Sequence, residues 1–311
     1  MLERIILDTD IGTDVDDAMA VTLAAISPEL KVEGITTVHK DTVLRARMVK
    51  KILYLLDRTD IPVYAGINEV LLRNRELWWL GHEGEGLLTE DDKDLTYESE
   101  HAVDFIIRTV MENPGEINLV PIGPLTNIAI SLIREPRLAK KVKRITIMGG
   151  VARMGKNASE LDYFEHNASR DPESTHIVYS SGAPITMVGL DVTRQVMLKL
   201  KDVERLESTS DELNLALAHM IRRWLEWYKH DYTAMNDPLA VAMVFDPSFC
   251  KTIRMKIHVE YDHRHPTGQT IPIKADDANV DICLEVDSGR FIKMLLDRIC
   301  NRPNLKIINP D

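Results

Sequence analysis

The chain has 311 residues, of which 44% are hydrophobic, and its formal net charge is −11. This negative charge argues against nucleic acid or an anionic membrane surface as the main partner, and it suits a neutral substrate or a cation. No apolar run is long enough for a transmembrane helix, and the N-terminal apolar stretch is too short for a signal peptide. Cys250, Cys283 and Cys300 match no zinc spacing or disulfide framework, so we expect reduced thiols in a cytoplasmic protein.

The first two thirds of the chain alternate short apolar runs with amphipathic helical patterns. We expect strands at residues 4–7, 31–38, 61–64, 117–122, 142–148 and 185–188. We expect helices at residues 15–26, 42–56, 102–111, 125–133 and 172–180, the second with basic residues on its outer face. This alternation is typical of parallel βαβ units covered by helices on both faces. The sequence therefore predicts an α/β fold with a doubly wound, mostly parallel central sheet, and ligands at the carboxyl ends of its strands.

The last third of the chain has a different pattern, with longer helices and separate strands. We expect helices at residues 211–229, 238–244 and 290–299, and strands at residues 253–259 and 280–286. No linker or internal repeat interrupts the chain, so we expect a single domain that spans residues 1–311. The polar segment 71–97 is rich in Trp, Glu and Gly, and a loop of this length is usually functional or mobile.

Five aspartates follow the first expected strand within ten residues: Asp8, Asp10, Asp14, Asp16 and Asp17. One or two acids would be explained by the first turn of a helix, which favours negative charge. Five carboxylates in one turn repel each other unless a cation or protons neutralise them. Because no cysteine or paired histidine accompanies them, the cluster predicts a hard cation such as Ca²⁺ or Mg²⁺.

A phosphotransferase with an aspartyl nucleophile is a competing enzyme class, since Asp8-Thr9-Asp10 is compatible with its motif. Such an enzyme needs phosphate-binding Lys or Ser at later strand ends, and segments 121–127 and 147–151 offer none. A dinucleotide-binding loop is excluded because the turn contains one glycine rather than three.

The acidic segment resembles the signature of the inosine–uridine nucleoside hydrolase family. From residue 8 it reads DTDIGTDVDDA, where the family typically has DxDPGxDDA, and two residues are added before the final Asp-Asp pair. Further segments are similar to family motifs at residues 35–38, 121–129, 147–150, 165–167, 171–173 and 236–242. Seven segments in the family's order cover roughly residues 5 to 245, which argues against chance and against shared fold alone.

The resemblance implies calcium-dependent hydrolysis of the N-glycosidic bond of a ribonucleoside, which releases ribose and a free purine or pyrimidine base. It implies that Asp10, Asp17, Asp237 and the backbone carbonyl of Thr126 bind one Ca²⁺. The ion would lower the pKa of a water, Asp10 would take the proton, and the water would attack C1′ of an oxocarbenium-like sugar. The residues implied in substrate binding are Asp16, Asp41, Met148, Asn157, Glu165 and Asn167. Family members usually form dimers or tetramers, so we expect a homodimer or homotetramer.

The sequence departs from the family where the leaving base is protonated. Asn236 stands where the family usually has histidine, and an amide cannot act as a general acid. We therefore predict slow purine hydrolysis unless another group donates the proton, which is typically worth about 10²–10⁴-fold in rate. His82, in a segment that resembles the family's H-G-x-x-G-L loop, is the first candidate. The further candidates are His39, His166, His230, Tyr228 and Tyr232, and His166 also replaces an aromatic residue of the family.

Two other functions remain open at this point. The chain could hydrolyse another N-riboside such as a nicotinamide riboside, or it could be a nucleoside-binding protein weakened in catalysis by Asn236. The complete acidic cluster, including Asp10, favours an active enzyme. Trp224, Trp227 and Tyr228 share one face of an expected helix, which predicts a core position more often than a base-stacking surface.

Overall fold

The structure, a computed structural model, describes residues 2–72, 75, 79–262 and 265–302. The strands are β1 (Glu3–Thr9), β2 (Leu30–Thr37), β3 (Val63–Ala65), β4 (Ile117–Pro121), β5 (Arg144–Met148), β6 (Ile185–Val188), β7 (Met197–Lys199), β8 (Tyr232–Ala234), β9 (Cys250–Val259), β10 (Thr270–Ile273) and β11 (Val280–Val286). The α-helices are α1 (Asp16–Ile26), α2 (Thr42–Leu55), α3 (Ala102–Glu112), α4 (Thr126–Arg134), α5 (Leu138–Lys141), α6 (His166–Arg170), α7 (Pro172–Tyr179), α8 (Leu190–Thr193), α9 (Leu200–Glu207), α10 (Glu212–Tyr228), α11 (Asn236–Phe245) and α12 (Ser288–Cys300). Two short 3₁₀ helices, η1 (Glu90–Asp94) and η2 (Pro247–Phe249), complete the chain.

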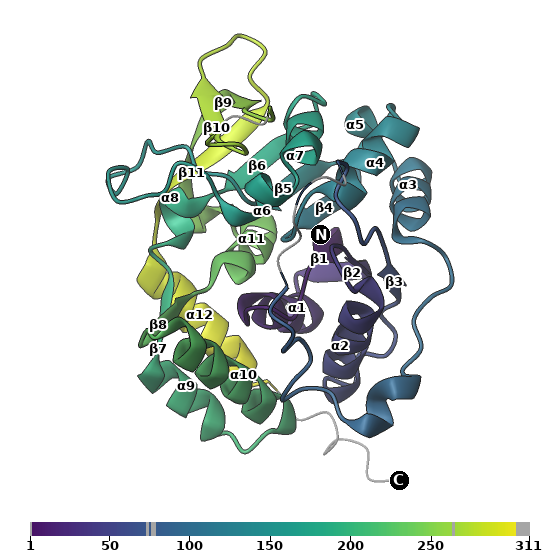
Figure 1. Cartoon of the computed structure of the whole chain (residues 1–311), viewed down its shortest axis with the longest axis vertical. Helices are drawn as coiled ribbons and strands as arrows, with labels where there is room; N and C mark the ends of the chain where they lie inside the picture. Colours follow the sequence, from purple (N-terminus) through teal and green to yellow (C-terminus); the bar gives the residue numbers. More distant parts are fainter. Residues whose placement is uncertain (1, 73–74, 76–78, 263–264, 303–311) are drawn as a thin grey trace.

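A nine-stranded sheet forms the centre of the molecule, in the order β10-β9-β11-β6-β5-β4-β1-β2-β3 (Figure 1). The strands from β11 to β3 pair in parallel, whereas β9 and β10 are antiparallel at one edge. A separate two-stranded sheet joins β7 and β8. The predicted α/β fold with a large, mostly parallel central sheet is therefore confirmed.

Alternate residues of the central strands enter two hydrophobic cores, one on each face of the sheet. In β1, Ile5 and Leu7 pack with α1, α2, α11 and α12, while Ile6 packs with α3, α4 and α7. Figure 1 shows these two groups of helices on opposite sides of the row of strands. Because both faces are covered, the strands have the continuous apolar character noted in the sequence.

The chain reverses its direction of winding between β1 and β4. The strands β1, β2 and β3 run outward on one side, and β4, β5 and β6 run outward on the other. In a doubly wound sheet, the loops after the two central strands separate at this point and leave a crevice for a ligand. The acidic segment follows β1 directly, so the fold places it at this switch point.

Several short elements are absent from the sequence-based expectation. The helices α5, α6 and α8 and the strands β7, β8 and β10 have three to five residues each, too few to show a clear period. Helix α9 was missed although Val203 and Leu206 lie at helical spacing and are buried. In its described part, segment 71–97 has η1 as its regular structure, and Glu98, directly after the segment, forms an isolated bridge with Tyr64. Within the described part of the chain, no helix combines the length and apolar character that a membrane crossing needs.

Candidate active site

A cavity of about 370 Å³ opens at the switch point of the sheet. Residues from three strand ends line it: Asp10 after β1, Ile122 after β4 and Met148 at the end of β5. The segment before α6, the end of α10 and the start of α11 supply further lining residues. A cavity of this volume has the size of a small-molecule site.

Six aspartates line this cavity, and five of them form the acidic cluster: Asp10, Asp14, Asp16, Asp17 and Asp237. Carboxylate oxygens of Asp14, Asp16 and Asp17 all lie within 4.8 Å of one another. Four of the five come from the segment after β1, and Asp237 comes from α11, more than two hundred residues later. The structure therefore completes the acidic cluster predicted from the N-terminal segment with a residue from a distant helix.

Burial raises the pKa of these carboxyl groups because a carboxylate loses its hydration there. The pKa of Asp10 rises to about 6, and the nearby guanidinium of Arg45 opposes the rise. For Asp14, Asp17 and Asp237, the repulsion between carboxylates adds to burial and raises the pKa well above its ordinary value. A cation relieves both costs, so this donor set of carboxylate oxygens fits a hard ion such as Ca²⁺.

Two helix N-termini hold the cluster together. Asp16 and Asp17 are the first residues of α1, and Asp237 is the second residue of α11, where the helix dipole favours negative charge. The backbone N–H groups of Asn236 and Asp237 donate to Oδ2 of Asp16 at 3.1 and 3.4 Å. The hydroxyl of Thr9 donates to Oδ1 of Asp17 at 2.5 Å.

Close packing fixes the turn that carries Asp10. Gly12 has φ +132°, which side chains rarely adopt, and a Cβ at Gly123 would lie 2.6 Å from Oδ1 of Asp10. Arg45 donates to the carbonyl of Ile11 at 2.5 Å and is only 1% exposed. The expectation that basic residues of this helix lie on its outer face is therefore wrong for Arg45.

The residues expected to hold the ribose form another part of the same cavity. Glu165, Asn167 and Met148 all line it, as does Asp16. Glu165 caps α6 and accepts three backbone hydrogen bonds at 2.8–3.0 Å, which fixes its carboxylate. The Asn167 amide donates to the carbonyl of Ile122 at 2.8 Å and contacts Sδ of Met148 at 3.4 Å. These contacts make a pre-formed polar surface beside the acidic cluster.

Besides His82, three predicted site residues lie outside the set that lines the cavity. Thr126 begins α4, is buried, and its hydroxyl donates to Oδ2 of Asp171 at 2.6 Å. Asp41 is the N-cap of α2, where its carboxylate accepts a backbone hydrogen bond at 2.9 Å. Asn157 lies in a turn after β5, and its buried Oδ1 has no partner among the described residues. The structure thus gives Asp41 a capping contact, and Asn157 is not among the residues that line the cavity.

Asn236, which replaces the histidine of the family, and His82, the first candidate for the leaving-group donor, are both engaged with the acidic segment. The Asn236 amide lines the cavity and donates to Oδ2 of Asp16 at 2.7 Å. Nε2 of His82 lies 2.8 Å from the carbonyl of Thr13, and His82 lines a separate small cavity behind that residue. In this structure His82 therefore holds the acidic segment and does not reach the main cavity.

Aromatic side chains form a wall of the cavity that the sequence favoured as core. Trp224, Trp227, Tyr228 and Tyr232 line it, and the Trp224 ring stacks on Trp227 and Tyr228 at centroid distances of 5.3 Å. Trp227 is 49% exposed and Tyr228 is 44% exposed. The core position expected for this helix face is therefore wrong at those two residues, since their rings meet solvent in the cavity.

Three basic residues also line the cavity: His166, Arg170 and Arg194. The sequence marked His166 as a further candidate for the leaving-group donor and as a departure from the family, and it gave no role to the two arginines. His166 and Arg170 are the first and last residues of α6, a helix too short to leave a periodic pattern. His166 follows the cavity residue Glu165 directly, and Arg170 lies four residues after His166. This helical spacing next to Glu165 is the signal that could have found them.

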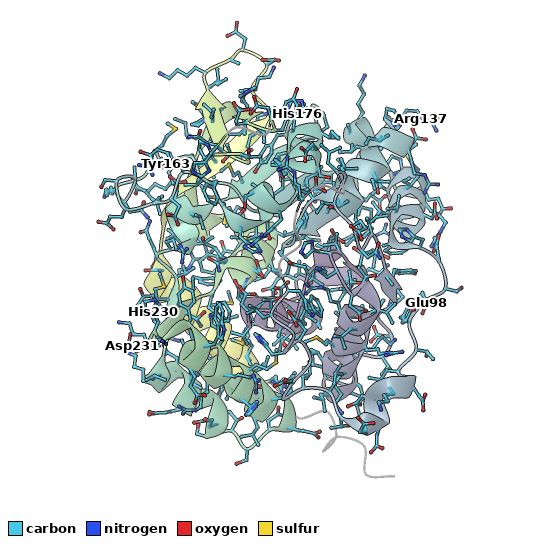
Figure 2. All side chains as sticks on the ribbon, viewed as in Figure 1. Glu98, Arg137, Tyr163, His176, His230 and Asp231 are labelled. Carbon is cyan, nitrogen blue, oxygen red and sulfur yellow. The ribbon has the colours of Figure 1, made fainter. Side chains whose placement is uncertain are left out.

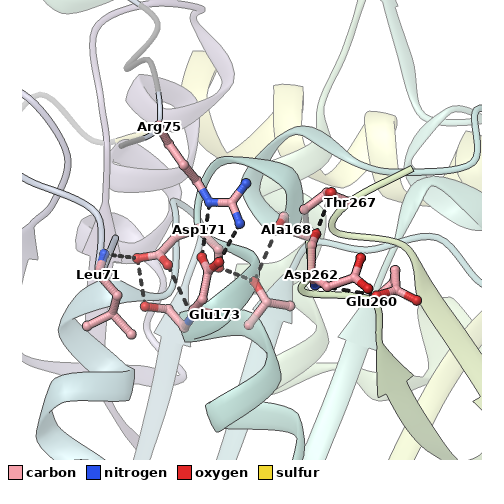
Figure 3. Close-up of polar contacts among 10 residues, drawn as sticks. Leu71, Arg75, Ala168, Asp171, Glu173, Glu260, Asp262 and Thr267 are labelled. Carbon is pink, nitrogen blue, oxygen red and sulfur yellow. Dashed lines mark hydrogen bonds and ion pairs between the residues drawn. The ribbon is translucent and has the colours of Figure 1, made fainter. Parts of the chain in front are cut away.

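The start of segment 71–97 is attached to the same part of the fold. The backbone N–H of Leu71 donates to Oδ2 of Asp171 at 3.1 Å, the oxygen that also accepts from Thr126 (Figure 3). Arg75 forms an ion pair with Glu173 at the first turn of α7 (Figure 3). These contacts join the segment to the helix N-terminus next to α6.

Known proteins with similar sequences and structures share this architecture. The chain matches the family model of inosine-uridine preferring nucleoside hydrolases over residues 5–293. It is 31% identical to the pyrimidine-specific ribonucleoside hydrolase RihA of Escherichia coli O1:K1 / APEC, covering 95% of this chain and 97% of that protein. The purine-preferring ribonucleoside hydrolase from Gardnerella vaginalis is 28% identical with a TM-score of 0.84, covering 96% and 98% of the two chains.

A plant nucleoside hydrolase, PpNRh1, is 29% identical with a TM-score of 0.82, covering 97% of this chain and 100% of that one. The family match extends over nearly the whole sheet and includes every segment that lines the cavity. The resemblance noted in the sequence is therefore confirmed, and the chain belongs to the inosine-uridine preferring nucleoside hydrolase family.

Proposed function

We propose that this protein hydrolyses the N-glycosidic bond of ribonucleosides to ribose and free base, with Ca²⁺ bound by the acidic cluster. The observation that supports this most directly is the single cavity that joins five aspartates to Glu165, Asn167 and Met148. The first group suits a cation, and the second offers hydrogen-bonding groups for sugar hydroxyls. The relatives named as ribonucleoside hydrolases support the same activity.

The ion would be held by Asp10, Asp17 and Asp237, with the backbone carbonyl of Thr126 as a further ligand. Asp14 lies close enough to Asp17 to share the ion or to hold one of its waters. When bound, Ca²⁺ neutralises the carboxylates, binds the ribose hydroxyls and makes a neighbouring water easier to deprotonate.

Side chains of the protein supply the remaining catalytic and binding roles. Asp10 accepts the proton of the attacking water, since its carboxylate lines the cavity within the acidic cluster. Asp16, Glu165 and Asn167 hydrogen-bond the sugar hydroxyls and orient C1′ towards that water. The carboxylates around the sugar stabilise the positive charge that develops on its ring in the transition state.

The base would lie against the aromatic wall formed by Trp227, Tyr228 and Tyr232, whose rings have faces open to the cavity. The relatives differ in the base that they prefer, because one is pyrimidine-specific and another is purine-preferring. The prediction of slow purine hydrolysis stays in place because Asn236 cannot protonate a base.

The test is release of free ribose from purine, pyrimidine and nicotinamide ribosides, with calcium and with a chelator. Calcium-dependent ribose release from one of the purine or pyrimidine ribosides supports the proposal and identifies the base. Cleavage confined to nicotinamide riboside would favour the alternative N-riboside hydrolase. Calcium and ribose binding without cleavage of any riboside would overturn the hydrolase and leave a binding protein.

We also propose that the chain forms one domain, residues 1–311, and assembles as a homodimer or homotetramer. Light scattering during gel filtration measures the mass of the assembly, and a monomer would contradict this part of the proposal.

A further inference from the structure

Cleavage of the N-glycosidic bond leaves negative charge on the departing base, so the cavity needs a donor at the base. This inference rests on the proposed function and concerns which residue supplies that donor. The Asn236 amide is committed to Asp16 at 2.7 Å, and the His82 ring is committed to the Thr13 carbonyl at 2.8 Å outside the cavity. His82 is therefore not placed to hydrogen-bond the base, and Asn236, which lines the cavity, has one of its two amide N–H groups engaged with Asp16.

Two of the other candidate histidines, His39 and His230, are excluded as donors to the base because of their positions. His39 is 3% exposed and is not among the cavity-lining residues. The ring of His230 packs against Tyr228 and Tyr232 at centroid distances of 4.7 and 5.4 Å and does not line the cavity either. Among the residues that the structure describes, His166 is the histidine that lines it.

His166 lies near the residues proposed to bind the sugar and also near the acidic cluster. It lies between Glu165 and Asn167, and both of these side chains line the cavity with it. The guanidinium groups of Arg45 and Arg170 act electrostatically on Asp10 and also on His166. His166 and Asp10, the residue that activates the attacking water, therefore have the same two arginines nearby. The bond that breaks must lie close to that water.

The surroundings of the ring determine its protonation state. The His166 side chain is exposed to water in the cavity, while nearby protein atoms reduce the hydration of the ring and two arginines lie near it. Burial and these positive charges lower the pKa of His166 to about 4. The imidazole is therefore neutral at working pH and carries one N–H that can be donated. A neutral histidine can stabilise developing negative charge by such a hydrogen bond.

We propose that His166 is the catalytic residue that donates a hydrogen bond to the departing base. As the C1′–N bond breaks, its electron pair moves onto the base, and the water oxygen forms the new bond to C1′. Asp10 takes the proton released by that water. The imidazole keeps its proton, and the base, hydrogen-bonded to the imidazole N–H, takes its own proton from solvent.

The experiment compares two leaving groups in the same holoenzyme. One substrate is the best nucleoside from the riboside panel, and the other is 4-nitrophenyl β-D-ribofuranoside, whose nitrophenolate leaves without a donor. The variants are His166→Phe, His166→Gln, which keeps an N–H donor, and Tyr232→Phe, which removes a competing hydroxyl from the cavity. His176→Phe is the matched control, because His176 lies on α7 outside the cavity-lining residues (Figure 2).

His166→Phe should lower kcat on the nucleoside by about 10²-fold, the typical loss for one donor to developing negative charge, and should change kcat on the nitrophenyl riboside little. His166→Gln should recover part of the loss, and His176→Phe should match the wild type on both substrates. An equal loss on both substrates, no loss on either, or a nucleoside-selective loss in Tyr232→Phe instead would overturn the role of His166. Wild-type cleavage of neither substrate would overturn the proposed function itself.

Discussion

At the residue scale, the carboxyl groups around the sheet's switch point dominate the site. Asp8 is fully buried beside Asp10, and burial raises its pKa to about 7 although Thr36 and Asn127 donate hydrogen bonds to it. The Asp237 pKa is raised well above its ordinary value by burial and by its acidic neighbours. Without a cation, these groups oppose folding whenever they are ionised.

The stability of calcium-free protein should therefore rise as the pH falls from 8 to 6.5. A carboxyl group whose folded-state pKa exceeds its unfolded value near 3.8 binds more protons when folded, so stability is lost as pH rises through the folded pKa. The lowered pKa of His166 acts in the opposite sense, but mainly below pH 6.5, where the unfolded ring becomes protonated. The melting temperature in chelator should shift by about 2–4 °C for each kcal/mol gained.

Two variants test whether the acidic cluster causes this pH dependence. Asp237→Asn should reduce the slope of melting temperature against pH, because it removes one of the repelling charges. Asp60→Asn should leave the slope unchanged, since Asp60 is a surface residue whose pKa is lowered by Arg58. A melting temperature that is higher at pH 8 than at pH 6.5 in chelator would contradict this picture.

The sequence was informative where site residues share one short segment. Asp10, Asp16 and Asp17 follow a buried strand and open a helix, so their proximity follows from local structure. The cavity position of Glu165 and Asn167 came only from resemblance to the family. The burial of Arg45 and the attachment of His82 to Thr13 depend on contacts across the fold, which no local pattern encodes.

At the element scale, segment 80–86 is docked on the turn that carries the acidic cluster. Glu83 is 8% exposed, and its carboxylate accepts from the Thr13 hydroxyl at 3.1 Å. It also accepts from the backbone N–H groups of Leu80 and Gly81 at 3.2 and 2.8 Å. Together with the contact between His82 and Thr13, these bonds join the loop to the segment that presents Asp14 to the cavity.

Glu83→Ala should make both segment 80–86 and the turn that carries the acidic cluster less stable. Leaving the Thr13 hydroxyl and two backbone N–H groups without their acceptor should cost about 1–3 kcal/mol. The melting temperature should fall, calcium should bind more weakly, and amide hydrogens of residues 80–86 should exchange faster. Glu85→Ala is the matched control, because exposed Glu85 pairs with Arg223 at the surface and contributes little. Unchanged exchange and calcium affinity in Glu83→Ala would show that the contact does not position the acidic segment.

Element prediction succeeded for the long, strongly patterned helices and for the short apolar strands such as β6, and it failed for several short helices. Helix α10 was expected at 211–229 and runs over Glu212–Tyr228, with Asp211 as its N-cap and Lys229 in a left-handed conformation that ends it. Helix α6 has five residues and is defined by its cap at Glu165 and by packing against the cavity, not by periodicity. Such elements form only when tertiary contacts stabilise them.

At the scale of the whole molecule, the order of the strands explains why distant residues meet. The reversal of winding between β1 and β4 opens the crevice, and the packing of α11 against α1 brings Asp237 to the acidic segment. The parallel, helix-covered sheet was predictable because alternation of strands and helices is visible in the sequence. The antiparallel edge formed by β9 and β10 was not, because strand order depends on pairings between distant segments.

The most direct test of the central claim is a calcium titration of chelator-treated protein in which bound calcium and ribose release are measured together. We predict that ribose release is absent without the ion and rises in proportion to occupancy of one calcium site per chain. We predict that Asp237→Asn binds calcium weakly and releases little ribose. Ribose release that persists after complete removal of calcium, or full calcium occupancy without ribose release from any riboside, would contradict a calcium-dependent nucleoside hydrolase.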